Sequence, residues 1–340
     1  MFVADHPPFR PFWFLDSPHL QTVASFFSPI KPAKNPTQRY VVRLPDNDRL
    51  VIHDNIPKKW ITGDRIVILL HGLCGSHRST YMRRVGEKLR RSGFRTIRVD
   101  MRGAGDSETI SRGHAHAASS DDLAAVVEAV HGLSPLSPLT LLGFSLGANI
   151  VLKLCGRWSI HHPQYVDSAI AVSPPIDLIY CSGNMRQWGN RLYDLFFCTQ
   201  LKASLERRRR SVPGLFDNGL KKLPNRLVHL DDQFVAPVNG FAGARDYYEQ
   251  ASSGPQLRDI DLQTVIIAAQ DDPLIPIKIF DHWVMSPQVD TIFVPHGGHL
   301  GFVGSTHGDP DSDWLDWRIV RWITNHDAAM ADQRIALRGV

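Results

Sequence analysis

The sequence reads Leu139-Thr140-Leu141-Leu142-Gly143-Phe144-Ser145-Leu146-Gly147-Ala148-Asn149 at the point that decides the fold. The pattern Gly-x-Ser-x-Gly stands here between an apolar run of strand length and a segment of helical character. A serine in that context lies on a sharp strand-to-helix turn, with its hydroxyl exposed at the carboxyl end of a sheet. The stretch therefore predicts Ser145 as a nucleophile; the alternative is a glycine-rich turn with a capping serine.

From Asp64 onward, the chain around this stretch alternates short apolar runs with amphipathic stretches of helical length. Such alternation is typical of βαβ units and a parallel sheet. Strands are expected at Arg65 to Leu70, Arg95 to Asp100, Leu139 to Phe144, Ala169 to Val172, Val265 to Ala269 and Thr291 to Val294. Helices are expected at 79–91, 120–131, 147–157, 275–284 and 313–325. We therefore predict an α/β fold with a mostly parallel central sheet and helices on both faces.

Two segments depart from the alternation. Residues 1–63 are rich in proline and aromatic residues, hold one strand-like stretch at Tyr40 to Leu44, and are expected to pack on the core as a lead-in. Residues 176–256 carry no buried-strand signal but contain helix-like pieces. Because a structureless loop of that length is rare inside a domain, we predict a helical cap or lid insertion there. The α/β core is then formed by residues 64–175 and 257–340.

A serine hydroxyl is a poor nucleophile unless a base takes its proton, and in this fold an acid and then a histidine follow the serine along the chain. The acid is Asp271 or Asp272, after one expected strand; we favour Asp272, because an Ala-x-x-Asp-x-x-x-Pro frame fits the usual turn. The base is His296 or His299, after the next strand; we favour His299, because two preceding glycines let the loop carry it over the sheet edge. Since the carboxyl ends of parallel strands share one edge, all these groups are expected to converge.

Acyl transfer also needs hydrogen-bond donors for the oxyanion that forms in the transition state. One donor is expected to be the backbone N–H of Leu146, directly after the serine, and the other the N–H of Leu73, in the glycine-bearing loop that follows the first core strand. The alternative reading of the second loop is an ordinary βα turn. A further glycine-bearing loop, Asp100 to Ser107, lacks both phosphate-binding patterns, so nucleotide binding is not expected.

Composition excludes several classes of protein. The 340 residues contain 38 Lys and Arg against 34 Asp and Glu, a net charge of +4, which is too balanced for a dedicated nucleic-acid binder. The run Arg207 to Arg210 is more typical of a solvated helix face than of a binding site. No apolar stretch approaches the roughly 18 residues of a membrane span, and the N-terminus lacks the layout of a signal peptide, so we expect a cytoplasmic protein.

Neither a metal nor an organic cofactor is expected. The pairs His114 and His116 and His161 and His162 lack an accompanying Cys/His cluster or a His-Glu-x-x-His pattern, so they read as surface or core histidines. The four cysteines are too sparse for a disulfide framework and contain no Cys-x-x-Cys pair.

Several strings spread along the chain resemble the α/β-hydrolase superfamily and, within it, the YheT-like esterase branch, also called AB hydrolase family four. The strings are Ser17-Pro18-His19-Leu20-Gln21-Thr22, His71-Gly72-Leu73, Arg102-Gly103, Gly143 to Asn149, Asp231-Asp232, Tyr247-Tyr248, Asp271-Asp272-Pro273 and His296-Gly297-Gly298-His299-Leu300-Gly301-Phe302. The Pro-His-Leu-Gln-Thr and His-Gly-Gly-His-x-Gly-Phe strings are the more specific. In this chain Ser17 replaces the usual Asn of the branch, and Cys74 an acidic residue.

The resemblance implies a triad of Ser145, Asp272 and His299, and a cap in the 176–256 region. It also implies a carboxylesterase acting on short- to medium-chain acyl esters or monoacylglycerols, without a cofactor, while some eukaryotic relatives pass the acyl group to an alcohol. The expected partner is a small acyl ester. Peripheral contact with lipid is compatible with this expectation, whereas a nucleic-acid partner is not expected. A non-catalytic binding protein of this fold would be expected to have lost at least one triad member. The Pro-His-Leu-Gln-Thr segment is expected to pack near the cap and help to close the site.

Overall fold

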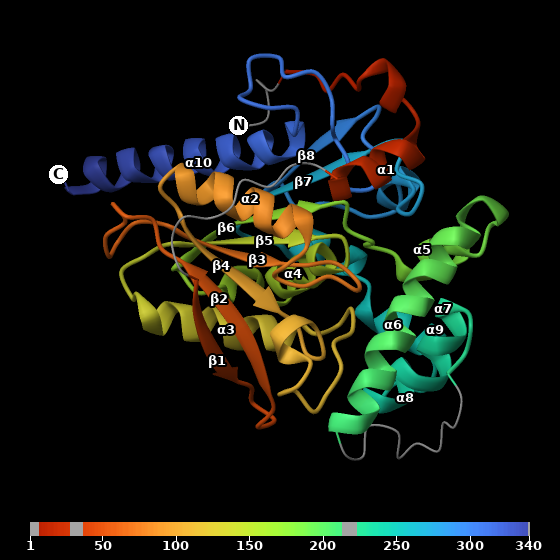
Figure 1. Cartoon of the computed structure of the whole chain (residues 1–340). Coiled ribbons are helices and arrows are strands. Elements are labelled where there is room, and N and C mark those ends of the chain that lie inside the picture. The colour runs from red at the N-terminus through yellow and green to blue at the C-terminus, as the bar shows by residue number, and fades with distance from the viewer. Residues whose placement is uncertain (1–6, 28–36, 213–222, 339–340) are drawn as a thin grey trace.

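The computed structural model describes residues 7–27, 37–212 and 223–338, in which eight strands form one sheet in the order β1-β2-β4-β3-β5-β6-β7-β8 (Figure 1). The strands are β1 (Gln38–Arg43), β2 (Arg49–Asn55), β3 (Ile66–Leu70), β4 (Arg95–Asp100), β5 (Leu139–Phe144), β6 (Val166–Val172), β7 (Gln263–Ala269) and β8 (Val289–Val294). Strands β3 to β8 run parallel, and β2 pairs antiparallel with β1 and β4. The predicted mostly parallel sheet is confirmed.

The N-terminal segment supplies two of these strands. The stretch expected at Tyr40 to Leu44 is β1, whereas β2 was not expected from the sequence. The second half of β2 consists of polar residues that are buried because they find partners in the fold; Arg95 of β4, for example, donates two hydrogen bonds to Asp54. Residues 38–55 thus extend the sheet beyond β4.

Side chains of the central strands alternate between two apolar layers, one on each face of the sheet. In β3, Ile66, Ile68 and Leu70 enter one layer, while Val67 and Leu69 enter the other. The first layer is covered by α3 (Ser120–Leu133) and α4 (Leu146–Trp158), and the second by α2 (Thr80–Arg91) and α10 (Trp314–Arg338) (Figure 1). The prediction of helices on both faces is confirmed.

A buried arginine ties several elements together at the amino-terminal edge of the sheet. Arg65, just before β3, donates hydrogen bonds to both carboxylate oxygens of Asp167 in β6 and to Asp327 in α10. Its guanidinium also donates to Thr140 in β5, and the side chain has no solvent exposure. Such a charge is tolerated in a core only when it is paired and hydrogen-bonded.

The chain between β6 and β7 is helical and lies beside the sheet rather than on its faces (Figure 1). It contains α5 (Leu178–Met185), α6 (Arg191–Ser211), α7 (Leu227–Leu230), a π-helical turn at Asp231–Val235, α8 (Ala236–Val238) and α9 (Ala244–Ala251). These elements share an apolar cluster that includes Leu205 and Phe234. We refer to residues 176–256 as the helical insertion.

Arg208 in α6 differs from the solvated helix face expected for Arg207 to Arg210. Its side chain is buried and donates hydrogen bonds to the carbonyl oxygens of Ser111, at 3.0 Å, and Gly113, at 2.7 Å. The guanidinium therefore joins the helical insertion to the loop that precedes α3.

The prediction of a helix at 275–284 is wrong. Only Ile277–Phe280 forms a short 3-10 turn. Beyond it the indole of Trp283 packs so closely on Gly254 that a side chain there would overlap it, and the N–H of Ser286 donates to the carbonyl of Leu257. Tertiary packing has overridden the local helical pattern.

Within the described residues no helix is long and apolar enough to span a bilayer.

Candidate active site

Ser145 lies on the turn between β5 and α4 with a strained backbone. Its φ of 52° and ψ of −120° are conformations that non-glycine residues rarely adopt. The flanking glycines permit the turn, because a side chain at Gly143 would overlap the backbone of Ala148, and one at Gly147 would overlap the carbonyl oxygens of Leu70 and His71. The N–H of Ser145 donates to Val172 in β6, which fixes the turn against the neighbouring strand.

The structure brings Ser145, His299 and Asp272 into one chain of hydrogen bonds. The Oγ of Ser145 lies 3.0 Å from Nε2 of His299, and Nδ1 of His299 lies 2.8 Å from Oδ2 of Asp272. The other oxygen of Asp272 accepts from the N–H groups of Leu274 and Ile275, which fixes the carboxylate. Because a carboxylate only accepts, the imidazole proton resides on Nδ1 and leaves the Nε2 lone pair facing the serine.

Asp271 and His296, the alternative candidates for the acid and the base, lie next to Asp272 and His299 but make other contacts. Oδ1 of Asp271 accepts a hydrogen bond from the N–H of Gly298, and its Oδ2 lies 3.4 Å from Nδ1 of the half-exposed His296. Asp271 thus holds the loop that carries His299, whereas Asp272 contacts the imidazole itself.

Ser145 and His299 open into a cavity whose walls are mainly apolar. Leu73 and Leu146, the expected oxyanion donors, line it beside the serine. Most of the apolar wall belongs to the helical insertion, with further residues from the loops after β6 and β7: Pro175, Leu178, Cys181, Met185, Phe197, Leu201, Leu227, Val228, Val235, Leu274 and Ile275. A cavity with such walls suits an apolar group.

Two carboxyl groups, Asp194 and Asp231, interrupt this apolar wall. Asp231 lies in the π-helical turn and accepts a hydrogen bond from the hydroxyl of Tyr248. Burial, with a smaller contribution from the charge of Asp194, raises the pKa of Asp231 to about 7. Its carboxyl is therefore largely uncharged in mildly acidic solution.

His71 orients the loop that contains Leu73. Its Nε2 accepts from the N–H of Met101 at 3.2 Å, so Nδ1 carries the proton and donates to the carbonyl oxygen of Gly72 at 2.7 Å. Burial lowers the pKa of His71, which keeps the ring neutral in this role. Gly72 packs directly on Ser145, since a side chain at this glycine would lie 3.0 Å from the Cβ of the serine.

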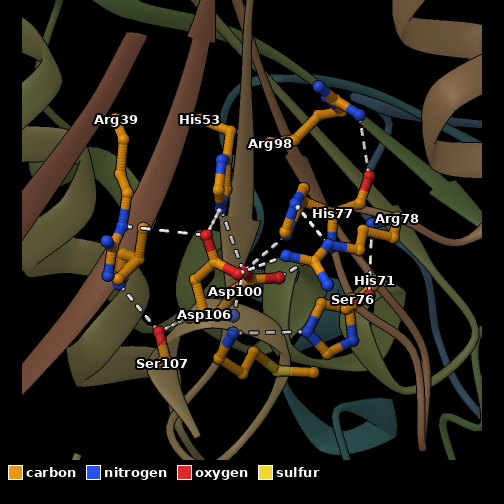
Figure 2. Close-up of polar contacts among 12 residues, drawn as sticks. Arg39, His53, His71, Ser76, His77, Arg78, Arg98, Asp100, Asp106 and Ser107 are labelled. Carbon is orange, nitrogen blue, oxygen red and sulfur yellow. Dashed lines mark hydrogen bonds and ion pairs between the residues drawn. The ribbon is translucent and has the colours of Figure 1, made fainter. Parts of the chain in front are cut away.

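Asp100, at the end of β4, connects this loop to the one that follows β4. Figure 2 shows His53 of β2 and His77 both pointing toward its carboxylate. The carboxylate also accepts from the backbone N–H groups of His77 and Asp106, at 2.7 and 2.8 Å. Burial alone would raise the pKa of Asp100, but the hydrogen bonds from His53 and His77 outweigh it and hold the pKa well below its usual range. An ionised Asp100 thus fixes both loops.

His53, His77, Asp100 and Asp106 carry donor atoms within 4.8 Å of one another, which raises the question of a metal ion. The Nε2 of His77 accepts from Nε of Arg78 at 3.2 Å, so the proton of His77 resides on Nδ1 and points at Asp100, 2.6 Å away. A ligand nitrogen needs a free lone pair. The arrangement is that of a hydrogen-bonded network.

The histidines singled out in the sequence have other surroundings. His114 and His116 line the main cavity. Burial, followed by the charge of Arg208, lowers the pKa of His114 to about 3, and burial, followed by Arg102, lowers that of His116 to about 4. Both rings are therefore neutral at physiological pH. His161 is exposed.

A second and more polar cavity adjoins the first at Leu73 and Leu146. Among its lining residues are Gln200, Ser204 and Arg207 of α6, and Arg207 is paired with Glu108 at 2.7 Å. The serine turn therefore lies between an apolar space and a polar one.

Sequence reasoning missed the role of Asp100. It expected Pro18 to Thr22 to pack near the cap, and His19 does lie 3.0 Å from the hydroxyl of Tyr193 in the helical insertion. It missed that Gln21 and Thr22 contact the loop that carries His299. The only signal was that two specific strings, one near each end of the chain, stood out. Nothing in either string says that they touch.

A mostly parallel sheet with a serine on the turn between β5 and α4 defines an α/β hydrolase, and a family model described as "alpha/beta hydrolase fold" matches residues 65–306. The chain belongs to the α/β-hydrolase family. It is 32% identical over 269 residues to "Putative esterase YheT" of Escherichia coli (strain K12), covering 76% of each chain.

More distant relatives and solved structures agree with this assignment. Identity to "Phospholipase ABHD3" of Mus musculus is 26% over 241 residues, covering 70% of this chain and 58% of the relative. The solved structure of Est1E from Butyrivibrio proteoclasticus superposes with a TM-score of 0.54 at 15% identity, covering 86% of this chain and 99% of Est1E. At that identity the likeness concerns the fold. The chain is a hydrolase homologue whose named relatives include esterases and phospholipases.

Proposed function

We propose that the chain is a serine hydrolase that cleaves carboxylic esters through Ser145, His299 and Asp272. The observation that carries the proposal is the hydrogen-bonded series from Ser145 through His299 to Asp272, opening into an apolar cavity. A nucleophile, a base and an orienting acid in this order are the requirements for acyl transfer to a serine.

In the proposed mechanism, Nε2 of His299 takes the proton of Ser145 as its oxygen attacks the ester carbonyl carbon. The resulting imidazolium is stabilised by Asp272, and returns the proton to the departing alcohol when the carbon–oxygen ester bond breaks. Water, activated by the same histidine, then attacks the acyl-serine and releases the acid. Over the two steps one ester and one water become one acid and one alcohol, so no oxidant or reductant takes part.

The oxyanion would be stabilised by the N–H groups of Leu146 and Leu73. Leu146 is the first residue of α4, where backbone N–H groups lack partners within the helix. The carbonyl of Gly72 is turned toward His71, and because C=O and N–H point in opposite directions in a trans peptide, the N–H of Leu73 points away from His71. Both leucines line the cavity at Ser145, which supports this assignment.

The two adjoining cavities suggest how an ester would lie. The apolar cavity suits a short- to medium-chain acyl group, and the polar one, with Gln200, Ser204 and Arg207, suits a hydroxylated alcohol such as glycerol. This supports acyl esters or monoacylglycerols as substrates.

The test is a panel of esters graded by acyl length, assayed with the wild type and with Ser145→Ala, together with labelling by a fluorophosphonate probe. We expect turnover and labelling in the wild type and neither in the variant. Full labelling of Ser145→Ala would refute the nucleophile assignment. Adding glycerol and measuring ester formed against acid released separates hydrolysis from acyl transfer to an alcohol.

A further inference from the structure

The helix α1 (Pro18–Phe27) packs on the loop that carries His299, so the two specific strings of the sequence meet in space. Thr22, one turn into α1, accepts a hydrogen bond from the backbone N–H of His299 at 2.9 Å. Its hydroxyl proton is used in turn on the carbonyl of Pro18, at 2.7 Å, which fixes the direction of the oxygen. The acceptor for the main chain of His299 thus comes from a residue near the start of the chain.

Gln21 holds the same loop a few residues further on. Its amide donates to the carbonyl of Val303 at 2.8 Å and accepts from the N–H of Val303 at 2.9 Å. The remaining amide proton is donated to the carbonyl of Leu15, and the side chain is fully buried. All three bonds are made in a site that excludes water, where an unpaired group is costly.

Two glycines of the histidine loop owe their presence to this helix. A side chain at Gly298 would overlap the carbonyl oxygen of Pro18, and one at Gly301 would overlap the carbonyl oxygen of Gln21. Pro-His-Leu-Gln-Thr and His-Gly-Gly-His-Leu-Gly-Phe are therefore the two sides of one close contact.

The loop needs outside support because its own backbone is strained. Leu300 and Phe302 have φ values of 62° and 52°, which non-glycine residues rarely adopt. Such conformations persist only where the surroundings determine them. The bond from His299 to Thr22 lies directly before Leu300, and the bonds from Val303 to Gln21 lie directly after Phe302.

Thr22 also lies where the helical insertion meets the site. The hydroxyl of Tyr193, on α6, interacts with the Thr22 side chain and lies 3.0 Å from Nδ1 of His19 on α1. The rings of His19 and Tyr193 stack with centroids 5.7 Å apart. The same helix thus contacts the histidine loop on one side and the insertion on the other.

We infer that Thr22 is a positioning residue for the hydrolytic reaction: it sets His299 at the distance from Ser145 at which proton transfer occurs, and Gln21 holds the other end of the loop. This rests on the proposed function. The effect passes through the main chain of His299, so it falls on the chemical step rather than on substrate binding in the cavity.

The test substitutes Thr22→Val, which keeps the shape and removes the acceptor. With a soluble short-chain ester we expect kcat to fall on the order of ten-fold or more, since small misplacements of catalytic groups have such effects. KM should change little, and the rate of fluorophosphonate labelling should fall in parallel with kcat. Thr22→Ser, which keeps the hydroxyl, should restore both.

Thr324→Val is the matched control. Thr324 makes the same bond to the carbonyl four residues before it, on α10 and outside the site. This variant measures how much stability a helix loses when the hydrogen bond from a threonine hydroxyl to the carbonyl four residues earlier is removed. Its kcat should equal that of the wild type. Thermal unfolding of all variants separates loss of rate from loss of folded protein.

Equal kcat and labelling in Thr22→Val and Thr324→Val would overturn the inference, as would a Thr22→Ser variant no better than Thr22→Val. A fall in rate that only follows the unfolded fraction would also overturn it. A wild type that neither turns over esters nor reacts with the probe would instead refute the proposed function.

Discussion

The hydroxyl of Tyr248 donates a hydrogen bond of 2.5 Å to Asp231 in the wall of the cavity that Ser145 and His299 share. A carboxyl group in an apolar cavity is expensive to ionise, and burial accordingly raises the pKa of Asp231 to about 7. In an unfolded chain the same group has a pKa near 3.8. Stability must therefore depend on pH.

Asp231→Asn should remove that dependence. Between about pH 4 and pH 7 the folded wild type keeps a proton on Asp231 that the unfolded chain has released, so its stability falls as pH rises, by at most about 1.4 kcal/mol per pH unit. Relative to the wild type, the variant should gain stability over this window. Urea unfolding at pH 5 and pH 7.5 measures it.

Tyr248→Phe provides the companion measurement. The hydrogen bond from Tyr248 lowers the pKa of Asp231, so its removal should extend the window above pH 7. A constant stability difference between wild type and Asp231→Asn at both pH values would contradict the raised pKa.

Two substitutions at Ser145 should differ in stability but not in activity. Both Ser145→Ala and Ser145→Gly remove the hydroxyl, so neither should turn over esters. Because φ at this position is 52°, glycine should relieve strain that alanine keeps, and unfold with a free energy higher by about 1 kcal/mol. Chemical denaturation of the two inactive variants tests this; identical unfolding free energies would argue against strain at the turn.

The neighbouring carboxylates should respond very differently to amide substitution. Asp272→Asn should lower kcat roughly 10,000-fold, because an amide cannot hold the imidazole in the required tautomer. Asp271→Asn retains an oxygen for the N–H of Gly298 and should lower kcat by less than about ten-fold. If Asp271→Asn proves the more damaging of the two, the acid has been assigned to the wrong residue.

Arg65→Met should reduce stability without changing the chemistry. Removing the guanidinium leaves Asp167 buried without its main partner, which costs about 3 to 5 kcal/mol. The site lies at the opposite edge of the sheet, so kcat per folded molecule should be preserved. Arg245→Met, in an exposed pair with Glu249, is the control and should cost less than about 1 kcal/mol. Equal losses in the two variants would contradict the role of Arg65.

Much of the fold could be predicted from local pattern. Strands β4 and β5 have the expected bounds. In β5 the reason is a mainly apolar run that is buried along its whole length, which leaves a strong local signal. Strand β2 was missed because it ends on the polar residues Asp54 and Asn55, whose partners Arg95 and Arg98 are distant in sequence. The predicted helix at 275–284 does not form because Trp283, within its helical pattern, packs on Gly254, which is distant in sequence.

The site divides in the same way. Ser145, Asp272 and His299 each follow a strand with a recognisable turn, so their convergence could be predicted from sequence order. The residues that hold them could not: Thr22 lies 277 positions from His299, and His53 lies 47 positions from Asp100. A threonine or a histidine in a polar setting carries no mark of its partner, and only the folded chain selects it.

The contact between α1 and the histidine loop bears on how the chain can be cut or changed. The recognised hydrolase segment begins at residue 65 and so excludes α1, yet Thr22 and Gln21 supply the acceptors on which that loop rests. A fragment trimmed to the boundaries of the family match would keep the proposed nucleophile, Ser145, and lose the support of the proposed base, His299. Across relatives, residues 18–22 and 298–303 should accordingly change together. A larger residue in one segment should occur only where the backbone of the other segment lies further away.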